Sequence, residues 1–193
     1  MKKILLSGSI IAACAINANA FYVGVEQSLS NSVTNETNSL ETDTSSNVTA
    51  IKIGTRRGDK KSSRMELLYE MGAETSNNIV GNGKSVIAFT LNYNATFETL
   101  SPVEELLPYV RLGGSYVISD EKYINLSDGE EYNYSAAGPH IGVGAYYNVT
   151  DNIDVSTGYD IGYRLWQDLH YGSQTVESED KFSKFYIGTN YSF

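Results

Sequence analysis

Two histidines are the residues best suited to acid–base or nucleophilic chemistry in this chain. Hydrolases and acyltransferases place a histidine beside a serine hydroxyl and a carboxylate, because the imidazole takes the hydroxyl proton and the carboxylate orients the ring. His140 lies in a segment with strand periodicity, and His170 precedes Ser173 in an acidic segment. We expect His140 to be a structural residue that is hydrogen-bonded to a neighbour, and we assign no residue a catalytic role.

Two groups of carboxylates are the other candidates for chemistry, because clustered oxygen ligands bind divalent cations. They are Asp120, Glu121, Asp128, Glu130 and Glu131 in one polar segment, and Asp168, Glu177, Glu179 and Asp180 in another. Neither group has the spacing of a calcium-binding loop, so we expect solvated charge, no metal site and no cofactor. The net charge is −9, and an acidic chain without a basic stripe is not expected to bind nucleic acid.

The elements that position these residues have a period of two. From Phe185 to Phe193, every second residue is apolar or aromatic apart from Thr189. Seven earlier segments show the same alternation: 21–27, 48–57, 64–72, 84–97, 108–119, 136–148 and 153–167. This alternation indicates β-strands, and most of the segments approach the roughly 9 to 11 residues of a tilted membrane-spanning strand. No segment after residue 20 approaches the roughly 20 apolar residues of a spanning helix.

The connections between these segments alternate between long and short. The long polar connections are 28–47, 73–83, 120–134 and 168–180, and the short ones are 58–62, 98–107 and 150–152. An outer-membrane barrel with both termini in the periplasm has this order, with the long loops outside. The sequence therefore predicts an all-β fold, an eight-stranded antiparallel up-and-down transmembrane β-barrel. The connection 98–107 also predicts a helical turn.

The two faces of the predicted strands differ in composition. One face is apolar and rich in tyrosine, whereas the other combines glycines with charged residues. The charged residues that we assign to a lumen network are Lys52, Arg56, Glu66, Glu70, Arg111, Asp160 and Arg164. Long charged side chains beside glycines fit a crowded lumen, because each long side chain needs a small neighbour. We expect the three arginines to balance the three carboxylates. This composition favours a membrane barrel over a water-soluble barrel, in which the faces would be exchanged.

Residues 1–20 have the features of a secretory signal peptide. Two lysines precede an apolar run at 4–16, and Ala18 and Ala20 are the small residues before a cleavage site. The predicted domains are therefore a signal peptide at 1–20 and an outer-membrane barrel at 21–193.

Cys14 is the only cysteine of the chain. The predicted barrel domain therefore uses no disulfide, although export would bring it to an oxidising compartment. The residues at 11–14 also resemble a lipoprotein cleavage box, so lipidation of Cys14 is an alternative to cleavage after Ala20.

Two segments resemble a known family. Residues 142–159 combine a glycine-alternating strand, a Thr-Asp-Asn turn and an apolar strand, and residues 108–116 read Pro-Tyr-Val-Arg-Leu-Gly-Gly-Ser-Tyr. Both resemble the OmpA-like, opacity-type small outer-membrane β-barrels. The resemblance implies a bacterial outer-membrane location among lipid and lipopolysaccharide. Tyr191 and Phe193 resemble the terminal signal that such barrels present to the barrel assembly machinery.

The resemblance and the long loops favour a non-enzymatic, structural and surface-interaction role. We expect an adhesin-like scaffold that displays four extracellular loops to a host or matrix ligand. One alternative is a small porin-like pore, although an eight-stranded interior is only wide enough for side chains to fill. A further alternative is a lipid A-modifying enzyme. That enzyme would depend on His170, which lacks the histidine-x-serine spacing of the lipid A deacylase.

Overall fold

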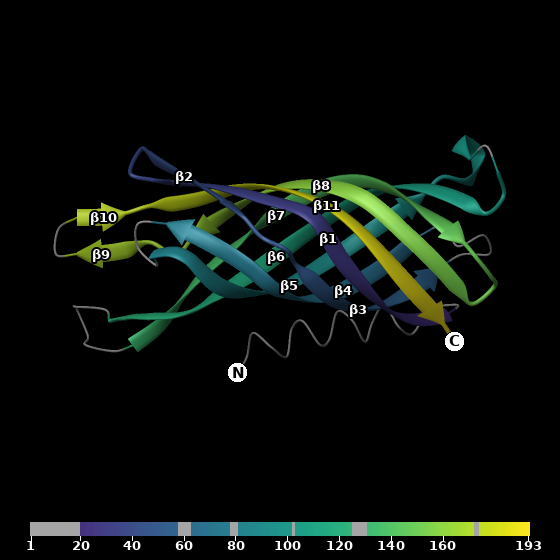
Figure 1. The fold of residues 1–193 in the computed structure, drawn as a ribbon, viewed down its shortest axis with the longest axis horizontal. Helices are drawn as coiled ribbons and strands as arrows, with labels where there is room; N and C mark the ends of the chain where they lie inside the picture. The colour runs from purple at the N-terminus through teal and green to yellow at the C-terminus, as the bar shows by residue number, and fades with distance from the viewer. Residues whose placement is uncertain (1–19, 58–62, 78–80, 102, 125–130, 172–173) are drawn as a thin grey trace.

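The fold is a closed antiparallel barrel (Figure 1). The computed structural model describes residues 20–57, 63–77, 81–101, 103–124, 131–171 and 174–193. Its long strands are β1 (Ala20–Thr37), β3 (Thr49–Arg57), β4 (Ser63–Asn77), β5 (Gly81–Thr96), β6 (Leu106–Ile124), β7 (Glu131–Asn148), β8 (Ile153–Trp166) and β11 (Ser178–Ser192). Each pairs with the next long strand along the chain, and β11 pairs with β1. The predicted eight-stranded topology is confirmed.

The pairing of β1 with β11 closes the ring. These strands are antiparallel neighbours from Tyr22 opposite Ser192 to Thr37 opposite Ser178, with one register shift near Ser28. Closure matters because hydrocarbon offers no water to hydrogen-bond a free strand edge. We call the end at which β1 begins and β11 ends the terminal end, and the opposite end the hairpin end.

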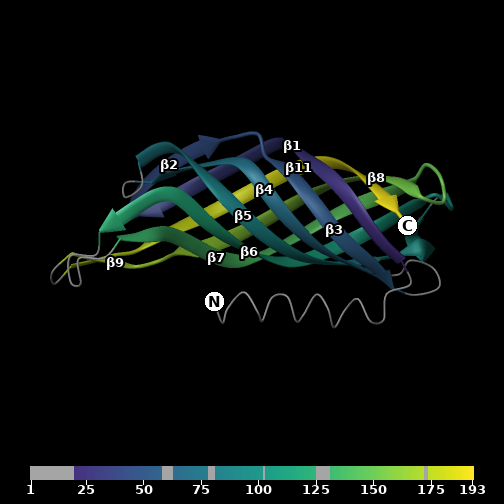
Figure 2. The same ribbon diagram turned by 90° about the horizontal axis from the view of Figure 1, so that it is seen from below.

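Outward side chains form an apolar belt, and inward side chains fill the lumen. Along β1, Phe21, Val23 and Val25 are about half exposed, whereas Tyr22 and Glu26 are buried. The outward apolar side chains of the other strands include Ile51, Ile53, Phe89, Leu91, Leu112, Ile141, Val143, Tyr159, Ile161, Phe185 and Ile187. Figure 2 shows the strands crossing the barrel at a tilt. An apolar outer belt is the surface that a barrel presents to lipid.

Short elements connect the strands at the terminal end. A 3-10 helix, η1 (Glu98–Leu100), confirms the helical turn predicted in 98–107. Between β7 and β8, the hydroxyl of Thr150 accepts a hydrogen bond from the backbone N–H of Ile153 at 3.0 Å. No helix in the described ranges has the length and apolarity needed to cross a membrane.

Additional short strands extend two of the connections at the opposite end. The β1–β2 hairpin, with β2 at Leu40–Ser45, turns through Asn38 and Ser39, whose φ angles are 48° and 67°. Positive φ at both central residues is the geometry of the tight hairpin turns that match the strand twist. The second hairpin consists of β9 (Leu169–Tyr171) and β10 (Gln174–Val176).

The boundaries predicted for the long polar loops are wrong. Strand β1 continues to Thr37, ten residues beyond the predicted end at Gln27, and stays paired with β11. Strands β4, β6 and β7 likewise run into the segments predicted as loops. The physical reason is that inward positions of the upper strands hold buried polar residues, such as Asn31, Asn35 and Thr37 on β1, so the apolar alternation ends before the backbone ladder does.

The turn residue Ser39 offers a test of the β1–β2 hairpin. Glycine adopts a positive φ without the steric cost that a Cβ incurs, so Ser39→Gly should stabilise the hairpin by about 0.5–1 kcal/mol. Amide hydrogen exchange in Leu40–Ser45 should become slower. Asn38→Gly is the matched control and should change exchange less, because asparagine already tolerates this conformation. Faster exchange in Ser39→Gly would contradict the turn geometry.

Candidate functional site

Charged side chains fill the lumen from the terminal end to its middle. Period two turns every second residue inward, so six strands contribute to this layer. The buried charged residues of this part of the lumen are Glu26, Lys52, Arg56, Arg64, Glu66, Glu70, Arg111, Asp154, Asp160, Arg164 and Lys184. All seven residues assigned to the lumen from sequence lie among them. We call this set the lumen charge layer. Asp180, for which solvated charge was expected, is also buried nearer the hairpin end, where its Oδ1 accepts a hydrogen bond from Asn35 at 2.8 Å.

Arg111 is the centre of the lumen charge layer. Its Nη1 lies 2.9 Å from Asp160 Oδ2, and its Nη2 lies 3.1 Å from Glu66 Oε2. Its Nε donates to Asn94 Oδ1 at 3.0 Å, and the guanidinium lies 4.6 Å from the ring centroid of Tyr186. One fully buried side chain on β6 therefore joins β4, β5, β8 and β11 across the lumen.

A second group surrounds Asp154 near the terminal end. The carboxylate accepts hydrogen bonds from Arg56, from Asn190 and from Nη1 of Arg64 at 3.1 Å. The Arg64 guanidinium also lies 3.5 Å from the ring centroid of Tyr146. Two cations on one carboxylate, with an aromatic ring against one of them, offset the cost of burying charge.

A third group lies around Lys184 on β11. Its Nζ is 3.0 Å from Glu70 Oε1 and 3.2 Å from Glu26 Oε1. Glu26 in turn lies 3.6 Å from Lys52 Nζ, and Lys52 lies 4.0 Å from Glu66. Lys52 and Glu66 therefore link this group to the centre at Arg111.

Tyrosines complete the layer and explain the inward glycines. The hydroxyls of Tyr22 and Tyr146 both donate to Glu66 Oε1, at 2.7 and 3.1 Å. A Cβ placed on Gly54 would lie 2.4 Å from the Tyr22 ring. No side chain fits at that contact, so glycine at position 54 allows the Tyr22 ring to pack directly against the backbone of β3.

The partners of two arginines differ from the expected balance. Arg56 bonds to Asp154, which was not assigned to the network from sequence. The Nε of Arg164 donates to Ser115 Oγ at 3.0 Å, and its guanidinium lies 4.0 Å from the ring centroid of Phe182. Strand parity indicates which face a residue occupies but not which residue lies across the lumen.

Sequence reasoning also left four members of the lumen charge layer out of the network. They are Glu26, Arg64, Asp154 and Lys184, and strand parity was the signal that could have found them. Arg64 precedes Glu66 by two positions, and Lys184 precedes Tyr186 by two positions. Lys184 was missed because the terminal strand was predicted to begin after it.

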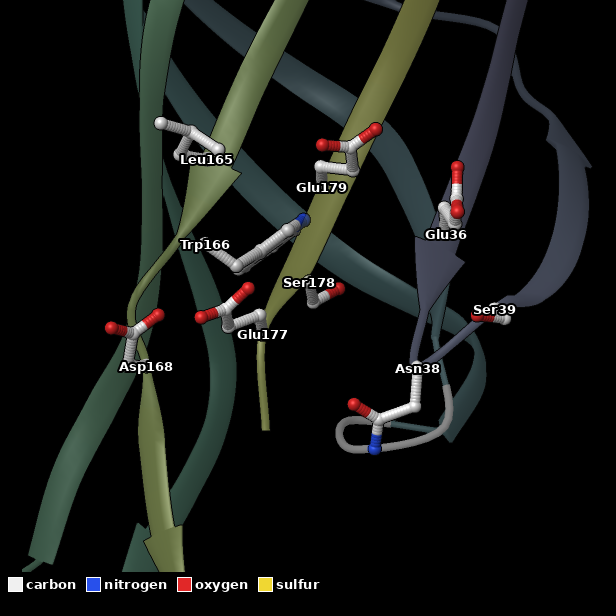
Figure 3. Close-up of a pocket in the computed structure, with 9 residues that line it drawn as sticks. All are labelled: Glu36, Asn38, Ser39, Leu165, Trp166, Asp168, Glu177, Ser178 and Glu179. Atoms are coloured by element: carbon white, nitrogen blue, oxygen red, sulfur yellow. The ribbon is translucent and has the colours of Figure 1, made fainter. Parts of the chain in front are cut away.

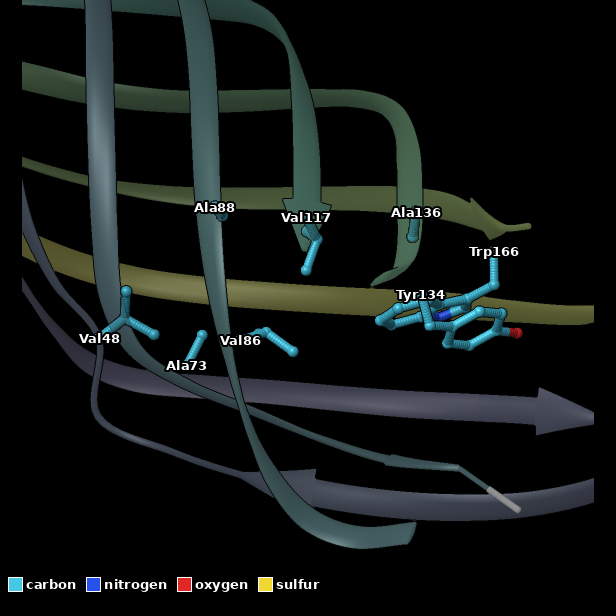
Figure 4. Packing of buried hydrophobic residues seen from close by; sticks show 8 residues of the cluster. All are labelled: Val48, Ala73, Val86, Ala88, Val117, Tyr134, Ala136 and Trp166. Atoms are coloured by element: carbon cyan, nitrogen blue, oxygen red, sulfur yellow. The ribbon is translucent and has the colours of Figure 1, made fainter. Parts of the chain in front are cut away.

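Toward the hairpin end, a cluster of apolar side chains fills part of the lumen (Figure 4). This apolar layer consists of Val48, Ala73, Val86, Ala88, Val117, Tyr134, Ala136 and Trp166. The rings of Tyr134 and Trp166 are stacked, with centroids 4.7 Å apart and planes 14° from parallel. The lumen therefore has a charged layer and an apolar layer, with buried polar residues such as Asn35 and Asp180 beside the second, and the sequence analysis predicted only the charged layer.

The histidines are separated in the structure. His140 is buried on β7, and its Nε2 lies 2.7 Å from Asn92 Oδ1. The backbone of His170 belongs to β9, but its side chain lies outside the described part. Within the described ranges, no group of three or more His, Cys, Asp or Glu residues has the geometry to hold a metal ion.

A cavity of about 550 Å³ lies at the rim of the hairpin end, between the top of β8 and the β1–β2 turn (Figure 3). Trp166 forms part of its wall, and its lining carboxylates are Glu36, Asp168, Glu177 and Glu179. Lys181 already lies 3.4 Å from Glu36 and 3.3 Å from Glu179. The rim is therefore acidic but partly neutralised by the barrel itself.

Comparisons with known proteins agree with this geometry. The model of the outer membrane protein beta-barrel domain family matches residues 4–193. Neisserial surface protein A is 17% identical, with 90% of this chain and 97% of that chain covered and a TM-score of 0.57. The N-terminal barrel of Pseudomonas aeruginosa OprF is 16% identical, with 89% of this chain and 97% of that chain covered and a TM-score of 0.50. The outer membrane protein AlkL is 14% identical, with 91% of each chain covered and a TM-score of 0.54. None of the curated proteins compared with the chain matches it.

Removing Arg111 tests the lumen charge layer. Arg111→Ala leaves Glu66 and Asp160 without their shared partner, and breaking a buried ion pair costs about 3–5 kcal/mol. The variant should unfold at a clearly lower urea concentration than the wild type in detergent micelles. Lys181→Ala is the control, because Lys181 pairs on the exposed rim, and it should leave the midpoint unchanged. Equal midpoints for Arg111→Ala and the wild type would contradict a packed, water-poor lumen.

Proposed function

The chain belongs to the outer membrane protein beta-barrel domain family and is an outer-membrane β-barrel protein, and we propose that it acts as an adhesin-like surface scaffold. The barrel is embedded in outer-membrane lipid, and the hairpin end carries the segments that meet a host-cell or matrix surface. No catalytic step or cofactor is part of this proposal.

One observation carries the proposal: the barrel wall continues as paired, polar strands beyond its apolar belt. On β11 the outward residues change from Phe185 to Lys181 and Glu179, and on β1 they change from Val25 to Glu36. Strands rise about 3.3 Å per residue, so this wall stands well clear of the lipid. Paired strands hold the connecting segments at their ends in fixed positions. Less conformational entropy is therefore lost when these segments bind a partner.

The lumen argues against the pore alternative. Arg64, Arg111 and Lys52 are fully buried, and their bonds cross the interior between strands. The apolar layer lies in series with these charges. A solute would have to displace both layers, so we do not propose conduction as the function.

The proposed orientation places the hairpin end outside the cell and both termini in the periplasm. It is supported by the tight connection at Thr150 and the longer hairpins at the other end, because outer-membrane barrels have short periplasmic turns. Residues 1–20 are proposed as a cleaved signal peptide. Ala20 opens β1 opposite Arg56, whereas Ala18 and Cys14 lie outside the described residues.

Tyr191 and Phe193 are proposed as the signal read by the barrel assembly machinery. Both side chains face outward, and Phe193 is 75% exposed. The backbone N–H of Phe193 donates to the carbonyl of Phe21 at 3.0 Å, which adds one bond to a ladder that is already closed.

Deleting Phe193 should therefore reduce outer-membrane yield in cells but leave refolding into detergent nearly unchanged. The physical reason is that an assembly signal acts on the unfolded chain, whereas the finished barrel loses a single terminal contact. Heat-modifiable mobility on denaturing gels measures the folded fraction in both settings. Equal yields in cells would contradict the assignment.

The scaffold proposal is tested by shortening two hairpins at the hairpin end, β1–β2 and β9–β10. In one variant, residues 33–44 and 168–177 are each replaced by a two-residue turn. The barrel should remain heat-modifiable, because its apolar belt is untouched. Whole cells that carry this variant should lose adhesion to cultured epithelial cells and to immobilised matrix proteins. Glu104→Ala with Glu105→Ala, at the terminal end, is the control and should adhere like the wild type. Unchanged adhesion after both hairpins are shortened would overturn the proposal.

A further inference from the structure

The barrel wall divides at the hairpin end. The lower part of β1 pairs with β3, whereas its upper part, Ser32–Thr37, pairs with β2. The pairing of β3 with β4 ends at Thr49 opposite Met71. Above that pair, β4 continues to Asn77 with β5 as its paired neighbour. Strands β2 and β4 therefore lie next to each other without a β-ladder between them (Figure 2).

Strand β2 keeps one free edge. Among the described residues, its only paired strand is β1. Its base is tied to β4 where the backbone N–H of Glu74 donates to Ser46 Oγ at 3.3 Å. In an antiparallel pair, every second residue points its N–H and C=O away from the partner strand. We call this row of backbone groups along Leu40–Ser45 the β2 edge.

The surroundings of the β2 edge are acidic. Glu41 and Asp43 are exposed on β2, and Glu36 on β1 lies directly opposite Glu41. Like charges in directly opposed positions destabilise a sheet. Residues 28–50 contain no lysine or arginine, and Lys181, at 3.4 Å from Glu36, approaches from β11 on the far side of β1. Among the described side chains of β2 and of β4 above Met71, none carries a positive charge, so the edge has no described cation on the side where its backbone groups are free.

We propose that the β2 edge docks an extended, cationic peptide segment of a partner protein. The peptide adds as a strand beside β2, so its backbone pairs with the free N–H and C=O groups. Side chains on one face of a strand recur every second residue, so lysines or arginines at alternate positions lie beside Glu41 and Asp43. The inference deepens the proposed scaffold function, on which it rests, by naming the chemistry of the partner.

A second copy of the chain is a poorer occupant of this edge. Antiparallel pairing of two β2 strands would bring the Glu41 and Asp43 side chains of both copies together. Charged residues on a free edge also serve to prevent such pairing. If the charges serve only to prevent pairing, the β2 edge should bind no peptide either. A peptide-binding measurement therefore distinguishes a docking edge from a protected edge.

The test uses the purified full-length barrel in lipid nanodiscs and a labelled eight-residue peptide that alternates lysine with threonine. We expect saturable binding, together with slower amide exchange in Leu40–Ser45 and no change in β9 or β10. The same peptide with every backbone nitrogen methylated keeps its charge but has no N–H donor. It should bind at least tenfold more weakly. Equal binding of the methylated peptide, or no binding of either, would overturn the proposal.

Charge reversal provides the second arm. Exposed ion pairs contribute modestly to binding, and two of them would be replaced by repulsion, so Glu41→Lys with Asp43→Lys should weaken binding by about tenfold. Glu104→Lys with Glu105→Lys is the matched control, because it changes the net charge equally at the terminal end, and it should bind like the wild type. An equal loss in both variants would show attraction by net charge alone and overturn the proposal.

Two other outcomes are separable. Dimerisation of the wild type that the peptide competes away would assign the β2 edge to a second copy and overturn the proposal. If the cells adhere through another hairpin, the adhesion assay of the scaffold function succeeds while the peptide measurements fail. Failure of the peptide site is thus distinguishable from failure of the scaffold function.

Discussion

Pairing of every backbone polar group within the membrane is the constraint on which the rest of the structure depends. Hydrocarbon cannot hydrogen-bond a free strand edge, so the sheet must close on itself, and β11 returns to β1 to close it. Closure divides all side chains between a lipid face and a narrow lumen. The lipid face accepts apolar residues such as Val23 and Ile141, and the remaining polar residues of the strands must share the lumen.

Sharing a narrow lumen forces charges to satisfy one another. Carboxylates there accept from more than one donor, as Glu66 does from Arg111 and Tyr22, and Asp154 does from Arg64 and Asn190. Such pairs do not stabilise a protein merely because they are buried, since desolvation opposes the attraction. Their consequence is specificity of the packed interior, because removal of any member leaves a buried charge without its partner.

The sequence contains the fold in its period of two and in the order of its connections. These patterns predict eight strands and the inward position of residues such as Arg111. They do not predict partners across the lumen, because the height of each side chain depends on the stagger between strands. Arg56 and Asp154 are distant in sequence and meet only once the ring closes. The upper parts of the strands were also missed, because inward residues such as Asn35 are polar although they are buried, so β1 lacks apolar alternation there.

The apolar layer has a spectroscopic consequence. Trp166 is the only tryptophan in the chain, and it is stacked on Tyr134 inside that layer. When the folded protein is excited at a wavelength that tryptophan absorbs and tyrosine does not, its emission therefore originates in one buried indole near the hairpin end, two positions beyond Arg164 along β8. A change in that emission reports rearrangement of the outer part of the barrel, whereas the charged interior is optically silent at the same wavelength.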